Sequence, residues 1–323
     1  MLERTEKTKS ALCLDVGIAL LPAAAWSAYL FGARAIVLML LCGLFAFGFD
    51  IPCSLYIFKM PFKKCLSGFA FLSGVLAAFL LPVTAPLWFA PIVGALVALC
   101  RSMRFWFCHR PLNAAVTAAA ALCILFPSYM ERYTKPFAYF PAFQINIDPA
   151  LVAEYQCWSP LDLIMKGKLY EDGIYGQLYG LAAGPLGAVG VLCIVFGFGY
   201  LIARRIVRIE TAGMYLLTLV VMACALSPNT TQMLTYAWFY ILSGAVPFAA
   251  FFALNDYATS PMRQYGTALI LFGVLAALLT VLFRALRLGL LGDLLAILLA
   301  DLATPFLEKF TEPRAYYDKR KKS

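Results

Sequence analysis

The sequence predicts an all-α polytopic membrane protein with ten transmembrane helices, which we expect to form two inverted five-helix repeats. Hydrophobic residues make up 63 % of the 323-residue chain and charged residues only 13 %, a balance that excludes a soluble globular domain. The hydrophobic residues fall into ten apolar segments, most of them near the roughly 20 residues that a helix needs to cross hydrocarbon. The basic residues between the segments alternate from one side of the membrane to the other.

The ten segments follow one another in order along the chain. The first five cover residues 11–31, 33–57, 66–81, 85–100 and 112–130, and the second five cover residues 186–203, 211–227, 232–253, 265–283 and 289–307. With the N-terminus placed inside the cell, nineteen of the 26 Lys and Arg residues lie inside and seven lie outside. A wrong span count would scramble this division, so the charges predict a multi-pass protein of a prokaryotic cytoplasmic membrane, with both termini cytoplasmic.

Five regions follow from this topology. They are an inner N-terminal tail (1–10), a first five-helix repeat (11–130), an outer loop region (131–185), a second five-helix repeat (186–308) and a basic inner tail (309–323). An odd number of spans in each half orients the halves oppositely, which is the inverted-repeat architecture of many transporters. The long outer region, rich in Tyr, Phe and Pro, predicts a functional or partner-binding loop. The basic tail is expected to contact anionic lipid or a partner.

Four carboxylates fall inside the predicted spans. Asp15 and Asp50 lie near the inner ends of their spans and Asp293 near an outer end, so we expect these three to reach water. Asp301 lies in the middle of the last span, with no Lys or Arg within helical reach. A carboxylate at that depth is expected to face the bundle interior and to titrate, pair or meet a ligand. Asp301 is therefore the candidate for an ion pathway.

The chain lacks the motifs of a self-sufficient enzyme. His109 is its one histidine, which excludes a multi-histidine metal site, and no P-loop or complete dinucleotide-binding fingerprint occurs. The net charge of +9 follows the topology rather than a basic patch with interleaved aromatic residues, so no nucleic-acid partner is expected. The ten cysteines form no CxxC pair and are expected to pack as small apolar residues. Redox chemistry in this chain would need a cofactor.

Several short motifs recur in the order known from one membrane-protein family. Residues 251–266 (FFALNDYATSPMRQYG) resemble the TDPxTSP-type segment of the RnfD/NqrB family, the membrane subunits of Rnf and sodium-pumping NADH:quinone oxidoreductase complexes. The other matching segments are Leu20-Leu21-Pro22, Pro111 to Pro127, Tyr200 to Arg205 and Ala296 to Asp301. The resemblance covers residues 10–308 and implies an electron-transfer role with flavin. Some acidic family positions are apolar here, such as Ala188 and Leu291.

The resemblance also implies where a covalent flavin would be attached. Members of the family carry FMN on a threonine of an outer-loop SGAT motif through a phosphoester. Ser159 stands at this acceptor position, and its hydroxyl offers the same ester chemistry. The three preceding residues differ from the motif, with Trp158 directly before the serine. Ser159 is thus the candidate site for covalent FMN, with the Trp158 ring as a candidate aromatic wall.

A second set of polar residues is expected to bind flavin without a covalent bond. Asn113, Asn255, Asp256 and Thr259 lie near the inner ends of their spans and offer polar anchors for FMN, riboflavin or another flavin. Flavin rings bind between apolar or aromatic walls with a few such anchors.

Two functions remain open from the sequence. The first is an integral membrane subunit of a flavin-dependent, Rnf/Nqr-like electron-transfer complex, an oxidoreductase or translocase subunit that is not catalytic alone. Its expected partners are other membrane subunits, a flavin-bearing protein on the outer face and lipid. The second is a flavin or small-solute transporter, channel or scaffold subunit that kept the fold and lost the covalent flavin site.

Overall fold

The computed structural model describes residues 9–56, 68–102, 112–166, 173–227, 232–255 and 266–311. Within these residues all regular structure is helical, apart from one isolated β-bridge between Thr134 and Gln156. The first half contains α1 (Lys9–Phe31), α2 (Ala33–Tyr56), α4 (Phe69–Phe79), α5 (Phe89–Ser102), α6 (Ala114–Leu125) and α7 (Pro127–Met130). Three short helices follow, α8 (Pro149–Tyr155), α9 (Pro160–Met165) and α10 (Gly173–Tyr179). The second half contains α11 (Val191–Ala203), α12 (Ile209–Ala225), α13 (Met233–Leu242), α14 (Val246–Phe248), the π-helix η2 (Ala249–Ala253), α15 (Gly266–Ala285) and α16 (Gly289–Thr311).

The all-helical class is confirmed, and each predicted apolar segment contains a helix. Within the described residues, four helices are long and apolar enough to cross a membrane: Ala11–Phe31, Ala33–Leu55, Thr267–Ala285 and Gly289–Leu307. A fifth candidate is the pair Met233–Leu242 and Val246–Ala253, whose two parts are bent by 72° at a short break. The remaining apolar helices are shorter, between 10 and 17 residues. The structure is therefore that of a multi-pass membrane protein.

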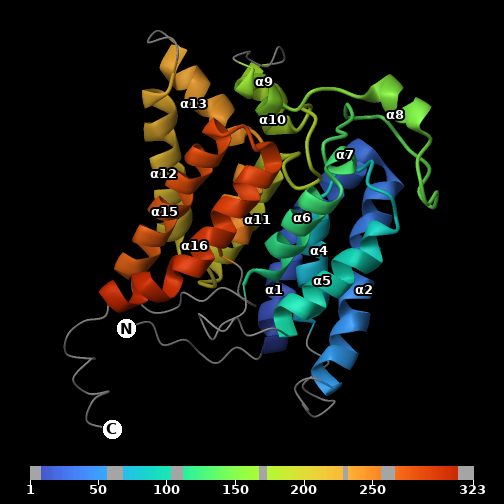
Figure 1. Cartoon of the computed structure of the whole chain (residues 1–323), viewed down its shortest axis with the longest axis horizontal. Coiled ribbons are helices and arrows are strands. Elements are labelled where there is room, and N and C mark those ends of the chain that lie inside the picture. Colours follow the sequence, from blue (N-terminus) through green and yellow to red (C-terminus); the bar gives the residue numbers. More distant parts are fainter. Residues whose placement is uncertain are drawn as a thin grey trace.

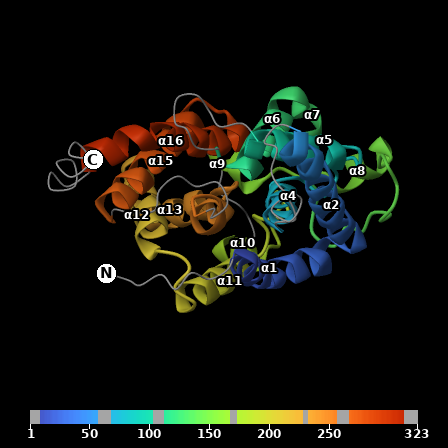
Figure 2. The same cartoon turned by 90° about the horizontal axis from the view of Figure 1, so that it is seen from below.

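The helices form two groups, and the main helix–helix contacts between the groups are α1–α11 and α6–α16. In one group α2 packs along α4 and α5, and in the other α12 packs along α13 and α15. Figure 2 shows these groups side by side, with α1 and α11 lying together along one edge. The α6–α16 contact is the second junction between them.

Glycine allows close helix contacts at matching places in the two groups. A Cβ atom on Gly94 of α5 would lie 2.6 Å from the Phe45 backbone of α2. A Cβ atom on Gly273 of α15 would lie 2.6 Å from the Thr211 carbonyl oxygen of α12. Small residues of this kind let helix backbones approach each other in a membrane, where packing rather than hydrophobic burial drives association.

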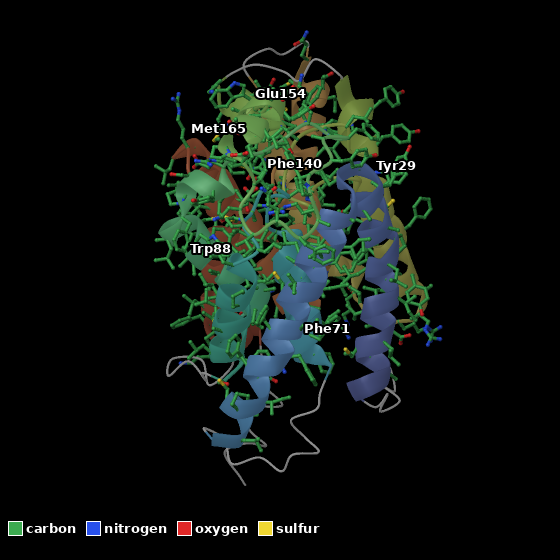
Figure 3. The ribbon with its side chains drawn as sticks, turned by 90° about the vertical axis from the view of Figure 1, so that its right-hand side faces the viewer. Tyr29, Phe71, Trp88, Phe140, Glu154 and Met165 are labelled. Carbon is green, nitrogen blue, oxygen red and sulfur yellow. The ribbon has the colours of Figure 1, made fainter. Side chains whose placement is uncertain are left out.

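The short helices α7–α10 gather at one end of the bundle, at the top of Figure 1. We call this end the loop face, and we call the end where α1 begins and α2 ends the opposite face. Figure 3 shows Glu154 and Met165 at the loop face, with Phe71 lower in the helical layer. Two backbone hydrogen bonds, Lys135 N–H to Tyr155 O and Cys157 N–H to Tyr133 O, tie two segments of the loop region together.

Two helix breaks lie next to the loop face. The chain leaves helical geometry between α4 and α5, at residues 80–88, and again between α13 and α14, at residues 243–245. Non-helical backbone inside a membrane protein needs partners within the protein, because hydrocarbon offers none. Both breaks are largely buried, and each is held by a buried arginine.

Candidate functional site

A cavity of about 220 Å³ opens at the loop face. It lies between the end of α6, α9, α10, the break after α13 and the turn between α15 and α16, so both halves of the chain line it. Pro160, Leu161, Leu242 and Leu290 contribute apolar walls. The volume is below the roughly 300–1,000 Å³ of pockets for drug-sized ligands, so the cavity fits one ring system rather than a whole nucleotide.

Ser159, the predicted flavin acceptor, lines this cavity as the N-cap of α9. Its hydroxyl donates to Asp162 Oδ2 over 2.6 Å and accepts from the Asp162 backbone N–H over 3.2 Å. The Ser159 N–H also donates to Asp162 Oδ2, which completes a reciprocal capping box. An ester on this oxygen removes its proton and places a phosphate beside the Asp162 carboxylate. The capped hydroxyl therefore does not fit a phosphoester unless the first turn of α9 opens.

Trp158 lies beside the cavity rather than in its wall. Its side chain is 63 % exposed, and the Lys166 ammonium lies 3.0 Å from the centre of the indole ring. A cation over an aromatic face is a favourable contact that fixes the ring. In this arrangement the ring is occupied by Lys166 and turned toward the surface of the loop face.

Two further polar side chains line the cavity, and the sequence did not single them out. Tyr133 is buried, and burial raises the pKa of its phenol well above its ordinary value, so the phenol keeps its proton. Gln177 of α10 is 2 % exposed, and neither atom of its side-chain amide has a hydrogen-bond partner among the described residues. A lone glutamine in a loop carries no sequence pattern, which is why only the structure reveals it.

Two of the four predicted anchors of a non-covalent flavin, Asn113 and Asn255, lie in the described residues, and both contact the π-helix η2. The Asn113 amide donates to Ala253 O over 2.7 Å, and its Oδ1 accepts from the Val116 N–H over 3.2 Å, so this side chain caps α6 and ties it to η2. The Asn255 amide donates to Ala250 O over 3.2 Å. Both amides thus serve helix ends. Asp256 and Thr259 lie outside the described residues.

Asp301 lies at the same junction. It is 5 % exposed, as expected for a carboxylate that faces the bundle interior, and its Oδ2 accepts from the Asn113 backbone N–H over 3.4 Å. This hydrogen bond links α16 to the start of α6. Asp301 and Asn113 therefore join the two halves of the chain at a buried point.

The expectation that Asp15, Asp50 and Asp293 reach water is wrong. All three carboxylates are at most 5 % exposed, and each pairs with an arginine of another helix or helix end. The pairs are Asp15–Arg204 at 3.0 Å, Asp50–Arg101 at 3.3 Å and Asp293–Arg284 at 2.8 Å. Such a partner offsets part of the cost of burying a carboxylate. The two members of each pair lie near span ends on the same predicted side of the membrane, a signal that was present in the sequence.

Arg284 and Asp293 also hold the break after α13. The guanidinium donates to Tyr240 O over 2.6 Å and to Ser243 O over 3.0 Å, in addition to both Asp293 oxygens. Asp293 Oδ2 in turn accepts from the Ala245 N–H over 3.1 Å. The pair thus satisfies backbone groups on both sides of Gly244, which has a positive φ of 66°.

Arg34 holds the break after α4 in a different way. Its guanidinium donates to the carbonyl oxygens of Val83, Ala85, Pro141 and Gln144, over 2.8 to 3.1 Å. Within the described residues the hydrogen-bond partners of Arg34 are carbonyls. The charge pattern of the sequence assigns both Arg34 and Arg284 to outer loops, whereas the structure buries both.

Comparison with known proteins decides the family. The NQR2, RnfD, RnfE family matches this chain over residues 3–317. The chain belongs to this family. The resemblance carried by the motifs is thereby confirmed, and the match extends over both halves and the loop face.

Individual members of the family are similar over nearly their whole length. The chain is 28 % identical to the D subunit of the ion-translocating oxidoreductase complex of Stutzerimonas stutzeri, over 94 % of this chain and 91 % of the relative. It is 28 % identical to the D subunit of the Na⁺-translocating ferredoxin:NAD⁺ oxidoreductase complex of Acetobacterium woodii, over 97 % and 92 %. It is 25 % identical to the D subunit of the proton-translocating ferredoxin:NAD⁺ oxidoreductase complex of Clostridium ljungdahlii, over 98 % and 94 %.

Proposed function

We propose that this chain is an integral membrane subunit of a flavin-dependent, Rnf-type electron-transfer complex. The observation that carries the proposal is the family match over residues 3–317, together with relatives named as D subunits of ion-translocating oxidoreductases that align over at least nine tenths of both chains. Its partners are other membrane subunits of the complex and a flavin-bearing protein on the outer face. The chain acts within the complex and is not catalytic alone.

We also propose that the chain spans the cytoplasmic membrane ten times, with both termini cytoplasmic and residues 131–185 outside. Matching contacts in the two halves support two inverted repeats. The pair α2–α5 corresponds to α12–α15, with close glycine contacts at Gly94 and Gly273. Helices α1 and α11, and likewise α6 and α16, pack against each other, as equivalent helices do around a twofold axis in the membrane plane.

The proposed cofactor is a flavin, as FMN or riboflavin, at the loop face. A flavin supplies electron transfer, which the side chains of this protein do not supply. The family resemblance puts covalent FMN on Ser159, whereas the capping box at this serine favours a flavin held without an ester. Asn113, Asn255, Asp256 and Thr259 remain the proposed anchors for a flavin near the opposite face.

We propose Asp301 as the carboxylate of an ion pathway between the two halves. It is buried beside the α6–η2 junction, where the hydrogen bond from Asn113 orients it. Relatives named for sodium translocation and for proton translocation are both similar to this chain, so the identity of the ion is left to measurement.

The decisive experiment is purification from native membranes followed by denaturing gel electrophoresis. We expect the other subunits to co-purify and the native complex to contain flavin. If the flavin is esterified to this chain, its band fluoresces after denaturation and the Ser159→Ala variant is dark. Thr134→Val is the matched control, because it also removes a buried loop-face hydroxyl but caps no helix. A chain that purifies without partners and without any flavin contradicts the proposal.

The capping box also favours a second candidate. A subunit that has lost the covalent flavin could transport a flavin or small solute, or serve as a scaffold. Flux of riboflavin into liposomes containing the purified chain, altered by Asp301→Asn, would support this candidate. Absence of flux, with assembly of the complex still dependent on the chain, would leave the scaffold role.

A further inference from the structure

The wall of the loop-face cavity contains a buried amide without a hydrogen-bond partner among the described residues. Gln177 lies in α10 with its side chain 2 % exposed, and both its Nε2 and its Oε1 lack partners among the described residues. Buried polar groups in native proteins are nearly always hydrogen-bonded, so an amide with two open positions calls for a ligand or ordered water. Gln177 is also part of the cavity wall.

The surroundings of Gln177 suit a flat, largely apolar ligand. Leu161, Leu242 and Leu290 line the cavity from α9, α13 and the start of α16. Gly180 and Gly244 also line the cavity, and both have a positive φ. Because they carry no side chain, they contribute backbone alone to the wall. The ligand therefore meets apolar walls and several polar side chains, among them Tyr133, Ser159 and the buried Gln177 amide. Apolar walls with a few polar groups are the usual composition of a site for a planar cofactor ring.

The chemistry of the amide narrows the choice of ligand. The edge of a glutamine amide presents an N–H donor and a carbonyl acceptor side by side in one plane, and the amide carries a second N–H on its other side. Its complement is a ring edge with a carbonyl next to an N–H. The pyrimidine edge of the flavin ring has this pattern, because N3–H lies between two carbonyls. A quinone has carbonyls but no N–H, and so it satisfies only half of the amide.

We propose that the loop-face cavity seats a flavin ring without a covalent bond, and that the Gln177 amide pairs with its imide edge. This inference rests on the proposed function, since it identifies a seat for the flavin at the loop face. It does not require an ester on Ser159. The capping box stays closed, and Arg287, an exposed residue that also lines the cavity, is available to the ribityl chain.

The test is a titration of the full chain with riboflavin, which has no phosphate and cannot form the ester. The chain is produced without a flavin transferase and purified in detergent, and binding is followed by quenching of flavin fluorescence. Gln177→Leu is expected to weaken binding about tenfold, or about 1.4 kcal/mol, from the loss of the paired hydrogen bonds. Gln144→Leu is the matched control, because its side chain is exposed and only its backbone carbonyl is used.

Two other ligands separate the possible outcomes. Riboflavin methylated at N3 is expected to bind the unmodified chain about as weakly as riboflavin binds Gln177→Leu, and menadione, a quinone, should not distinguish the two chains. Equal riboflavin binding by the unmodified chain and Gln177→Leu overturns the role of Gln177, and the proposed function then survives with the flavin elsewhere. Absence of flavin from both the purified chain and the native complex contradicts the proposed function itself.

A stability measurement excludes a merely structural effect. Replacing an amide that has no partner in the described part of the chain should leave the thermal midpoint of the unliganded chain unchanged or raised. Added riboflavin should raise the midpoint of the unmodified chain but not that of Gln177→Leu. A lowered midpoint without ligand would show that Gln177 supports the fold, through ordered water for example, and would overturn the proposal.

Discussion

The break after α13 and the break after α4 are both held by a buried arginine, but the two arginines are neutralised differently. Arg284 faces a carboxylate and two carbonyls, with Asp293 completely buried beside it. Arg34 faces four carbonyls, two from the break itself and two from the loop-face segment at residues 141–144. One break is closed by an ion pair and the other by backbone dipoles.

The difference determines what each break depends on. The Arg284–Asp293 pair spans nine residues, so α15 and α16 bring it together locally, and it then fixes the distant segment at residues 243–245. The Arg34 cluster needs segments 49 to 110 residues away, so it exists only when the loop face has folded. The break after α4 is therefore coupled to the loop, and the break after α13 to a helix hairpin.

The largest effect is expected from Asp293→Ala. It leaves the Arg284 guanidinium buried without its carboxylate, which costs about 3–5 kcal/mol in the free energy of unfolding. Thermal unfolding of the purified chain in detergent measures this loss. The double variant Arg284→Met, Asp293→Leu should recover only part of it, because it removes the uncompensated charge but leaves Tyr240 O, Ser243 O and the Ala245 N–H without their side-chain partners. A double variant as unstable as Asp293→Ala would show that the backbone contacts, not the charges, hold the break.

A somewhat smaller loss is expected from Arg34→Met, about 3 kcal/mol in the free energy of unfolding. This change removes the buried charge itself and leaves four carbonyls without their donor. Limited proteolysis distinguishes it from Asp293→Ala, since cleavage should increase within residues 137–148 in Arg34→Met alone. Equal proteolysis of the loop in both variants would remove the distinction between the two breaks.

The smallest losses of stability are expected from alanine substitutions at the two glycines that lie beside these arginines. Gly244 and Gly32 both have a positive φ, which costs an alanine about 1–2 kcal/mol. A Cβ on Gly244 also lies 2.5 Å from the buried Asp293 Oδ2, whereas a Cβ on Gly32 meets the Tyr139 ring, which is 61 % exposed and hydrogen-bonded through its hydroxyl to Tyr29 O. Gly244→Ala should therefore lower the thermal midpoint more than Gly32→Ala. The reverse order would mean that the Asp293 contact yields more easily than the aromatic one.

The sequence predicted the helical class, the family and the position of each apolar segment, because hydropathy and the order of motifs are local properties. It did not predict the two helix breaks, because counting charges assigns an arginine near the end of a span to the adjoining loop. It also misjudged Asp15 and Asp50, whose partners Arg204 and Arg101 lie 189 and 51 residues away. A search for acids and arginines near span ends on the same side of the membrane would have identified these ion pairs.

The candidate sites were predicted less completely. Ser159 and Asp301 were identified from the family pattern and from hydropathy, and both lie in buried, polar surroundings. The hydroxyl of Ser159 proved to be a helix cap, which depends on the backbone conformation at Pro160 and Asp162 and not on residue type alone. Gln177 could not be found, because its significance comes from the lack of a partner among the described residues in three dimensions.

The position of Arg34 also bears on how the chain is made. The ribosome completes α2 long before it reaches Pro141 and Gln144, which lie 107 and 110 residues beyond Arg34. During that interval the guanidinium has to be held by interfacial water or by the insertion machinery, because a charge left in hydrocarbon is costly. Folding of the loop face then draws it inward. The first half of this protein thus reaches its final structure only after the ribosome has synthesised residues beyond that half.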